Sequence, residues 1–207
     1  MAETAGTTLS FHVSGPRPTT AIRSSLPVTG TITGGSVVIV PQVELRIGVT
    51  LQGRPAAPDD RWIIPVEVWL HTPGTPWNED PGNGSLFYFQ TYTNNEGVIV
   101  LMVDPGTYDI RVKGLTTLKN LSTDVNVSPP GPVEVSLGTL IEGDVNGDNM
   151  VTGMDYSAII MCFGYEVDDP LAPAPTPRCD FNNDGYVTGM DYSAIIMNFG
   201  LGGADIE

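Results

Sequence analysis

Basic residues are scarce in this chain of 207 residues, which has 9 Lys and Arg against 24 Asp and Glu and a formal net charge of −15. Nucleic acids and anionic membrane surfaces bind clustered Lys and Arg, so the composition excludes both as expected partners. No apolar run reaches the roughly 18 residues of a membrane span. The two histidines, His12 and His71, lie near no Ser or Cys nucleophile motif. We therefore expect no enzyme activity.

A signal peptide is also lacking, because the residues after Met1 have neither a basic start nor an apolar centre. We interpret the chain as the mature form of a secreted or cell-surface protein to which an initiating Met was added. Its 24 Gly and 18 Pro favour turns and short strands over long helices.

The acidic residues are concentrated at the C-terminal end, where residues 142–207 have 12 acids and a single base, Arg178. An internal repeat accounts for most of this segment. Residues 143–164 read GDVNGDNMVTGMDYSAIIMCFG and residues 179–200 read CDFNNDGYVTGMDYSAIIMNFG, which agree at 16 of 22 positions. The change in charge and the repeat together predict a domain boundary near residue 141.

Each copy places oxygen-bearing side chains at positions 1, 3, 5, 9 and 12 of a twelve-residue loop, the spacing of an EF-hand, in which position 7 adds a backbone carbonyl. The predicted ligands are Asp144, Asn146, Asp148, Met150, Thr152 and Asp155 in the first loop, and Asp180, Asn182, Asp184, Tyr186, Thr188 and Asp191 in the second. Position 6 requires a positive φ, which suits Gly185 and is tolerated by Asn149, so the first site is expected to be slightly weaker.

Two Ca²⁺ ions are the expected cofactors of these loops. Magnesium usually keeps several waters, and transition metals prefer His or Cys ligands, which neither loop has at a ligand position. The alternative for each loop is an Asp, Asn and Gly-rich turn that binds no metal.

Neither loop has a helix before it, since a strand-like segment precedes Asp144 and a proline-rich one precedes Asp180. A duplicated loop-helix unit with the phrase D-x-N-x-D-x-x-V-x-x-x-D resembles the dockerin domain, type I-like, over residues 143–200. The resemblance implies an F-hand module with two antiparallel helices related by a pseudo-twofold axis. It also implies calcium-dependent docking onto a cohesin-like domain of another protein.

The partner contacts that this resemblance implies fall on equivalent residues of the two copies: Gly153, Met154, Ile160, Met161, Gly189, Met190, Ile196 and Met197. Better-known cellulosomal members usually have hydroxyl and basic residues at these positions, so the identity of the partner is not inherited. Because both copies present the same residues, the pseudo-twofold predicts two binding orientations rotated by about 180°.

The helical repeat predicts two different faces in each copy. Tyr156, Ile159, Ile160 and Phe163 form one apolar stripe that we expect in the core, and the second copy repeats it with Tyr192, Ile195, Ile196 and Phe199. The opposite face has Met154, Ser157, Ala158 and Met161, repeated as Met190, Ser193, Ala194 and Met197, and is a candidate interface. The alternative is that this Met face packs on the preceding domain.

The two cysteines, Cys162 and Cys179, follow the first helix and precede the second loop. The antiparallel helices implied by the resemblance bring these two places together. We predict a disulfide between them in an exported protein, and two unpaired thiols are the alternative.

Seven alternating or apolar segments rich in Val, Ile, Tyr and Phe predict strands before the repeat. They lie at residues 43–51, 65–72, 85–93, 97–104, 107–114, 122–128 and 132–140. Seven strands in about 100 residues indicate an Ig-like or prealbumin-like β-sandwich. Residues 94–114 resemble the prealbumin-like, carboxypeptidase-regulatory-like family, and Tyr108 is expected to anchor the P-G-T-Y turn in the core.

The predicted organisation is therefore a Thr, Ser, Gly and Pro-rich segment at 1–42, a β-sandwich at 43–141, a dockerin-like helical module at 142–202 and a tail at 203–207. Two strand-like pieces of the first segment could extend the sandwich or join a neighbouring molecule. The predicted function is non-catalytic, extracellular docking onto a cohesin-like partner. The runner-up is a calcium-stabilised, self-assembling structural protein whose helical module packs on its own sandwich. A third candidate is a carbohydrate-binding module with Trp62, Trp69, Trp77 and Tyr88 as the sugar platform.

Overall fold

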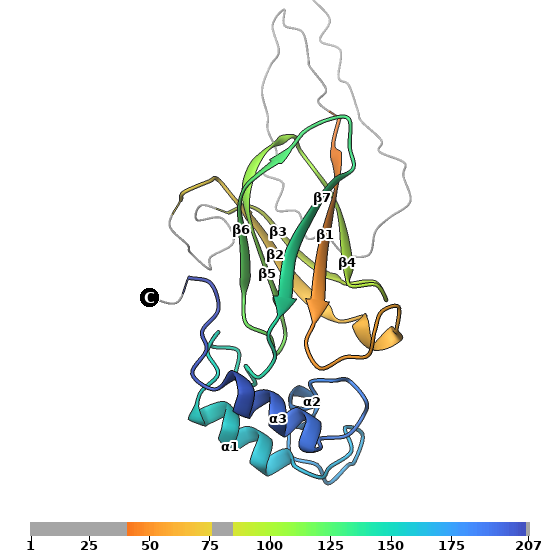
Figure 1. The fold of residues 1–207 in the computed structure, drawn as a ribbon, viewed down its shortest axis with the longest axis vertical. Helices are drawn as coiled ribbons and strands as arrows, with labels where there is room; N and C mark the ends of the chain where they lie inside the picture. Colours follow the sequence, from red (N-terminus) through yellow and green to blue (C-terminus); the bar gives the residue numbers. More distant parts are fainter. Residues whose placement is uncertain (1–40, 76–84, 206–207) are drawn as a thin grey trace, which may run out of the picture.

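The seven predicted strands form two facing sheets above a small helical module (Figure 1). The structure, a computed structural model, describes residues 41–75 and 85–205. The three-stranded sheet has the order β4 (Val98–Val103), β1 (Val43–Leu51), β7 (Val133–Leu140). The four-stranded sheet has the order β3 (Ser85–Tyr92), β2 (Pro65–His71), β5 (Gly106–Gly114), β6 (Asn120–Val127). The β-sandwich prediction is confirmed.

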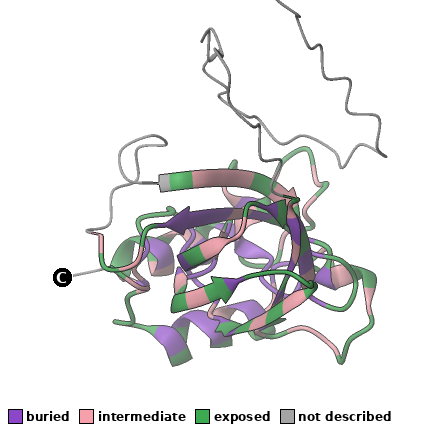
Figure 2. Ribbon diagram, turned by 90° about the horizontal axis from the view of Figure 1, so that it is seen from above, coloured by how far each residue is buried: buried purple, intermediate pink, exposed green. Residues whose placement is uncertain are grey.

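Alternation along the strands explains which side chains form the core, because successive residues point to opposite faces of a sheet. In β1, every second residue from Val43 to Leu51 is buried. Ile47, Val68 and Ile110 come from both sheets and have no exposed surface. Figure 2 shows buried residues on the strands between the outer, more exposed ones. Strand β1 pairs antiparallel with β4 but parallel with β7.

The turn between β4 and β5 is anchored as the sequence predicts. Tyr108 is buried, and its hydroxyl donates a hydrogen bond to the carbonyl of Asp104 at 2.8 Å. A Cβ atom at position 106 would lie 2.8 Å from the same hydroxyl, so Gly106 leaves the space that the ring needs.

Of the residues predicted to form a sugar-binding platform, the two described tryptophans are buried and cannot stack on a sugar ring. Trp62, in the short 3₁₀ helix η1 (Asp60–Trp62), is 7% exposed and donates its indole N–H to the carbonyl of Pro55. Trp69 is 6% exposed and packs against Tyr88 with 5.5 Å between ring centroids. Trp77 lies outside the described residues. Both indoles are therefore part of the packing of the sandwich, as is usual for its aromatic residues.

The helical module contains α1 (Gly153–Cys162), α2 (Thr176–Cys179) and α3 (Gly189–Asn198). The short α2 ends directly before Asp180, so the prediction that no helix precedes the second loop is wrong there, because a proline in the first turn of a helix loses no intrahelical hydrogen bond. Residues 164–167, which follow α1, pair with residues 185–187 of the second repeat. Residues 200–203, which follow α3, pair in the same way with residues 149–151 of the first repeat. Each hydrogen bond of one pairing recurs in the other after a shift of 36 residues. This correspondence supports the predicted pseudo-twofold relation between the copies.

The module packs directly on one end of the sandwich. The backbone N–H groups of Gly143 and Asp144 both donate to the carbonyl of Thr116, in the connection between β5 and β6. The side chain of Asn198 donates to Gln52 at 2.7 Å. Residues 203–205, predicted to be a tail, also join the two parts, because Asp205 pairs with Arg111 at 2.7 Å. No helix within the described residues has the length and apolar character that crossing a bilayer requires.

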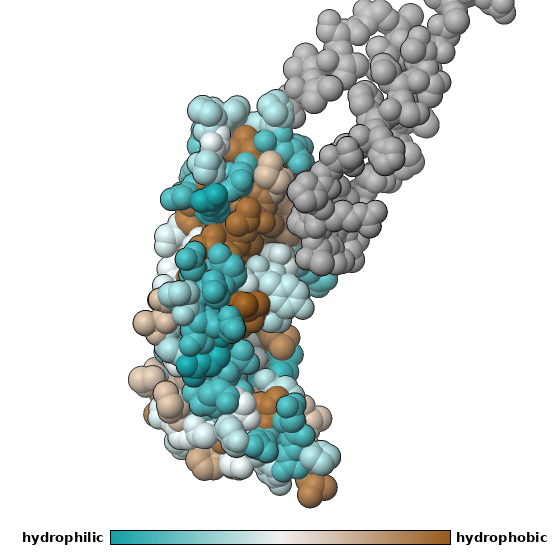
Figure 3. Space-filling view, turned by 90° about the vertical axis from the view of Figure 1, so that its right-hand side faces the viewer, coloured by the Kyte–Doolittle hydropathy of each residue, from teal (hydrophilic) through white to brown (hydrophobic). Residues whose placement is uncertain are grey.

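The prediction of added N-terminal strands falls on residues 1–42, of which all but the last two lie outside the described residues. Among the described strands, β4 is an edge strand of its sheet. It has two exposed apolar side chains, Val100 and Met102. An apolar area is visible on the sandwich in Figure 3.

Candidate calcium-binding and docking site

Each predicted calcium loop runs directly into a helix, and one short phrase serves both structures. Thr152 and Thr188, at loop position 9, are the N-cap residues of α1 and α3. Asp155 and Asp191, at position 12, are the third residues of these helices and accept the backbone N–H of the same threonines at 2.8 and 2.9 Å. The phrase T-G-M-D is therefore a capping box, which satisfies N–H groups that the helix itself leaves unpaired.

The carboxylates at position 1 hold the backbone of their loops. Asp144 accepts N–H groups from Gly147 at 2.7 Å and from Asn149 at 2.9 Å. Asp180 accepts N–H groups from Asp184 at 3.1 Å and from Gly185 at 2.8 Å. Both carboxylates are buried, and burial raises the pKa of Asp180, against the effect of its two backbone donors. A buried carboxylate of this kind gains most from a neighbouring cation.

The carboxylates at position 12 connect each loop start to its helix. The second oxygen of Asp155 accepts the N–H of Asn146 at 3.0 Å, and that of Asp191 accepts the N–H of Phe181 at 2.8 Å. Both carboxylates are buried. Positions 1 and 12 thus close each loop from its two ends.

Positions 3 and 5 complete the same pattern in both copies. The amide of Asn146 donates to Asp148 at 2.8 Å, and the amide of Asn182 donates to Asp184 at the same distance. At position 6, the backbone of Asn149 has a φ of 70° and that of Gly185 a φ of 93°. The predicted left-handed turn is confirmed in both loops.

The side chain of Asn149 has a second role that glycine could not fill. Its oxygen accepts the N–H of Lys119 at 2.7 Å, and its amide donates to the carbonyl of Ala204 at 3.0 Å. The first loop is therefore attached to the sandwich through its position 6. The sequence feature that could have indicated this contact is the Asn at position 6 of the first loop, where the second loop has Gly185.

The donor set fits calcium, although the described residues contain no cluster of three or more His, Cys, Asp or Glu side chains arranged to hold a metal. Three carboxylates, an amide and a hydroxyl stand in each loop at the predicted positions. The carboxylates here turn toward backbone N–H groups of their own loops. Hard oxygen donors around buried carboxylates are what a calcium site requires. The twelve ligands stay a prediction.

All eight predicted partner contacts lie on the exposed surface of α1 and α3. Among them, Met154 and Met161 are 68% and 59% exposed, and their counterparts Met190 and Met197 are 63% and 69% exposed. We call the exposed faces formed by these eight residues the two Met faces. Ala158 and Ala194, predicted for the same interface, do not belong to it, because Ala194 is buried in the apolar cluster of the module and Ala158 packs against that cluster. The alternative in which this surface packs on the preceding sandwich is therefore wrong, and the module uses its loops and residues 198–205 for that contact instead.

The predicted core stripe of each helix is only partly correct. Ile159 and Ile195 are fully buried, and Tyr156 and Tyr192 are partly buried against one another, with 3.2 Å between their hydroxyl oxygens. The other members, Ile160, Phe163, Ile196 and Phe199, are about half exposed. Two short helices that pack on each other bury only a narrow part of each helix surface. The predicted four-residue stripe is wider than this buried part. Ile160 and Ile196 already belong to the two Met faces, and the exposed Phe163 and Phe199 extend them.

The structure does not have the predicted disulfide between Cys162 and Cys179. Both cysteines are free thiols, which was the alternative. Both are fully buried in the apolar cluster of the module. Burial raises the pKa of the Cys179 thiol, and its hydrogen bond with Cys162 acts in the same direction. The thiolate is the reactive form, so the protonated pair is chemically protected where it lies.

Contacts between distant segments were missed by the sequence reasoning. Arg54 pairs with the fully buried Glu142 at 3.1 Å, and Lys113 forms an ion pair with Asp144. Their partners are 88 and 31 residues away. The composition holds one indirect indication of these ion pairs: the chain has only 9 Lys and Arg, so few are available to pair with its many acids.

A β-sandwich attached to a duplicated loop-helix module defines the class of this protein. Residues 142–200, nearly the whole of the C-terminal module, match the family model described as "Dockerin type I domain". Dockerin type I domains bind calcium and act as non-catalytic docking modules. The match leaves residues 1–141 outside it, and the search of curated proteins found no match to the chain.

Two similar solved structures come from Acetivibrio cellulolyticus and are both described as mutants of a "type II Cohesin-X-Dockerin complex". The N-terminal interface mutant is 18% identical, covers 80% of this chain and 99% of that chain, and has a TM-score of 0.55. The C-terminal interface mutant is 16% identical, covers 79% and 99%, and has the same TM-score. At these identities the likeness shows a shared fold that includes both the sandwich and the helical module.

Proposed function

We propose that this protein is a non-catalytic, extracellular assembly module that docks onto a cohesin-like domain through the two Met faces of α1 and α3. The observation that carries this is the exposure of eight equivalent residues on the duplicated helices of a dockerin domain. Adaptable Met side chains beside Ile suit a protein interface, and exposed apolar surface of this kind marks contact sites. The solved X-dockerin structures with this fold were determined in cohesin complexes.

The sandwich acts in this proposal as a fixed support for the docking module. Its β5–β6 connection, its Arg54 and its Gln52 all contact the module. These contacts hold α1 and α3 in a fixed position, with the two Met faces exposed to a partner.

Calcium titration tests the cofactor. After chelation, isothermal titration of the whole chain is expected to show two bound Ca²⁺, because each loop has a complete set of oxygen ligands. Replacing the position-1 residue of both loops, Asp144→Ala with Asp180→Ala, should remove both binding events. Zero ions bound by the unaltered chain would contradict the proposal.

Docking itself is tested with immobilised cohesin domains of types I and II. The unaltered chain with calcium is expected to bind at least one of them, and excess chelator should abolish that binding, because the loops position both helices. The position-1 double variant serves as a calcium-insensitive control. Binding that persists in chelator, or no binding to any cohesin, would contradict the function.

One observation favours the second candidate, a self-assembling structural protein. Strand β4 is an edge strand with exposed Val100 and Met102, and exposed apolar edges invite pairing with another sheet. Concentration-dependent filaments or oligomers, formed with calcium and without any cohesin, would support this candidate over docking.

A further inference from the structure

We propose that Lys113, a residue of the sandwich, lowers the affinity of the first calcium loop and holds that loop in place when calcium is absent. The inference rests on the proposed calcium binding by the dockerin module. It makes the two loops, which agree at eight of twelve positions and share every predicted side-chain ligand, different in behaviour.

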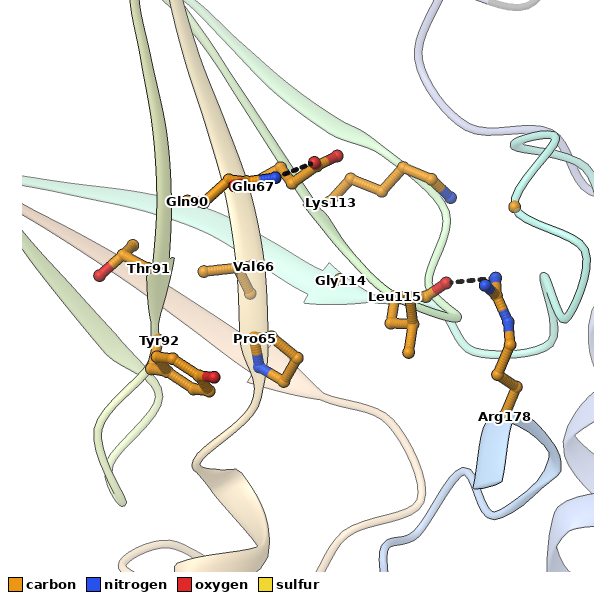
Figure 4. Close-up of a pocket in the computed structure, with 11 residues that line it drawn as sticks. Pro65, Val66, Glu67, Gln90, Thr91, Tyr92, Lys113, Gly114, Leu115 and Arg178 are labelled. Carbon is orange, nitrogen blue, oxygen red and sulfur yellow. Dashed lines mark hydrogen bonds between the residues drawn. The ribbon is translucent and has the colours of Figure 1, made fainter. Parts of the chain in front are cut away.

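Lys113 reaches the first loop from strand β5. Its ammonium group forms an ion pair with one carboxylate oxygen of Asp144, the residue at position 1, and donates to the carbonyl of Thr117 at 2.7 Å. The Lys113 side chain is 12% exposed and that of Asp144 is not exposed. Figure 4 shows Lys113 extending from the sheet toward the loop segment. A cation thus stands beside a carboxylate that calcium would bind.

The second loop has no ion pair of this kind among the residues that the structure describes. The ion pairs found among the described residues include none with Asp180, Asp184 or Asp191. The pKa of Arg61 is raised first by Asp59, whose carboxylate binds the guanidinium at 3.0 Å, and only then by the charge of Asp184. The first loop therefore starts with one carboxylate already neutralised, and the second does not.

The ion pair has opposite effects on the two states of the first loop. Without calcium, the ammonium group offsets the charge of buried Asp144 and keeps the loop against the sandwich. With calcium, it either leaves Asp144 or stays beside a divalent cation that repels it. Both courses make binding less favourable. A pocket of about 530 Å³ lined by Lys113, Gly147 and Arg178 gives the displaced side chain room to move (Figure 4).

Substitution of Lys113 separates this effect from folding. Lys113→Met keeps the apolar stem and removes the charge. In a chain whose second site is weakened by Asp184→Ala, Lys113→Met is expected to lower the dissociation constant of the first site about tenfold by calorimetry, which corresponds to about 1.4 kcal/mol. In chelator, the same substitution should speed hydrogen exchange in residues 144–152, because the loop has lost its substitute cation.

Two controls make the experiment specific. In a chain whose first site is weakened by Asp148→Ala, Lys113→Met should leave the affinity of the second site unchanged. Arg46→Met, which removes an exposed charge from the sandwich, should change neither site. A first-site affinity that stays within twofold, or becomes weaker, with Lys113→Met would overturn the inference. If the unaltered chain binds no calcium, the proposed function fails, whereas two bound ions with no Lys113 effect refute this inference alone.

Discussion

Replacing Met154, Met161, Met190 and Met197 together by alanine is expected to weaken cohesin binding at least about 100-fold, or about 2.7 kcal/mol. The four side chains are the most exposed large apolar groups of α1 and α3. Interfaces concentrate their energy in a few such buried anchors. Alanine also favours helix, so the helices should be kept. The measurement is surface plasmon resonance with calcium present.

Either pair alone should behave very differently. Because the pseudo-twofold offers two equivalent orientations, Met154→Ala with Met161→Ala removes one of them and leaves the other. The expected loss is then about twofold, or about 0.4 kcal/mol. Met102→Ala with Leu86→Ala, a pair of exposed apolar residues on the sandwich, should not change binding. A full loss from the first pair alone would show that only one orientation exists.

Breaking the buried ion pair at the junction is expected to cost about 3–5 kcal/mol of unfolding free energy at pH 7.5. The side chain of Arg54 is 4% exposed and binds Glu142, whose other oxygen accepts the Thr116 hydroxyl at 2.7 Å. Arg54→Met leaves the Glu142 carboxylate buried without its counter-ion. Urea unfolding measures the loss, with the unaltered chain as reference at each pH.

The pH dependence gives this prediction its sign. Burial raises the pKa of Glu142, and the charge of Arg54 opposes that rise, so removing Arg54 raises the pKa further. A carboxyl with a raised folded pKa contributes stability below its unfolded pKa, about 4.3, and loses it as pH rises through the folded value. The deficit of Arg54→Met should therefore shrink toward pH 5.

A matched double variant distinguishes charge from packing. Adding Glu142→Gln to Arg54→Met removes the isolated charge, and most of the lost stability should return. A deficit below about 1 kcal/mol at pH 7.5, or one that does not depend on pH, would contradict an ion pair that stabilises the junction.

The sandwich could be predicted from sequence because its signal is local. Alternating side chains identify a strand and the face that it buries, and all seven strands were found within a few residues of their ends. Alternation does not say which strand is the neighbour. The parallel pairing of β1 with β7, at opposite ends of the sandwich sequence, therefore had no signal in either segment.

The candidate site also has local features that the sequence predicts and long-range contacts that it does not. The loop positions and the positive φ of Asn149 follow from spacing within twelve residues, so they could be read directly. The exposed positions of Ile160 and Phe163 depend on how much of α1 its neighbours cover, which a helical wheel does not contain. The contact of Lys113 with Asp144 depends on how the module sits on the sandwich.

The isolated β-bridges between the two copies of the module have a consequence for how these copies relate. The segment after α1 completes the second loop, and the segment after α3 completes the first. One repeat on its own would have an unpaired loop and an unpaired segment, which a second identical molecule could satisfy. The module therefore has the construction of a swapped homodimer whose two subunits are joined in one polypeptide, with Tyr156 and Tyr192 touching at its axis.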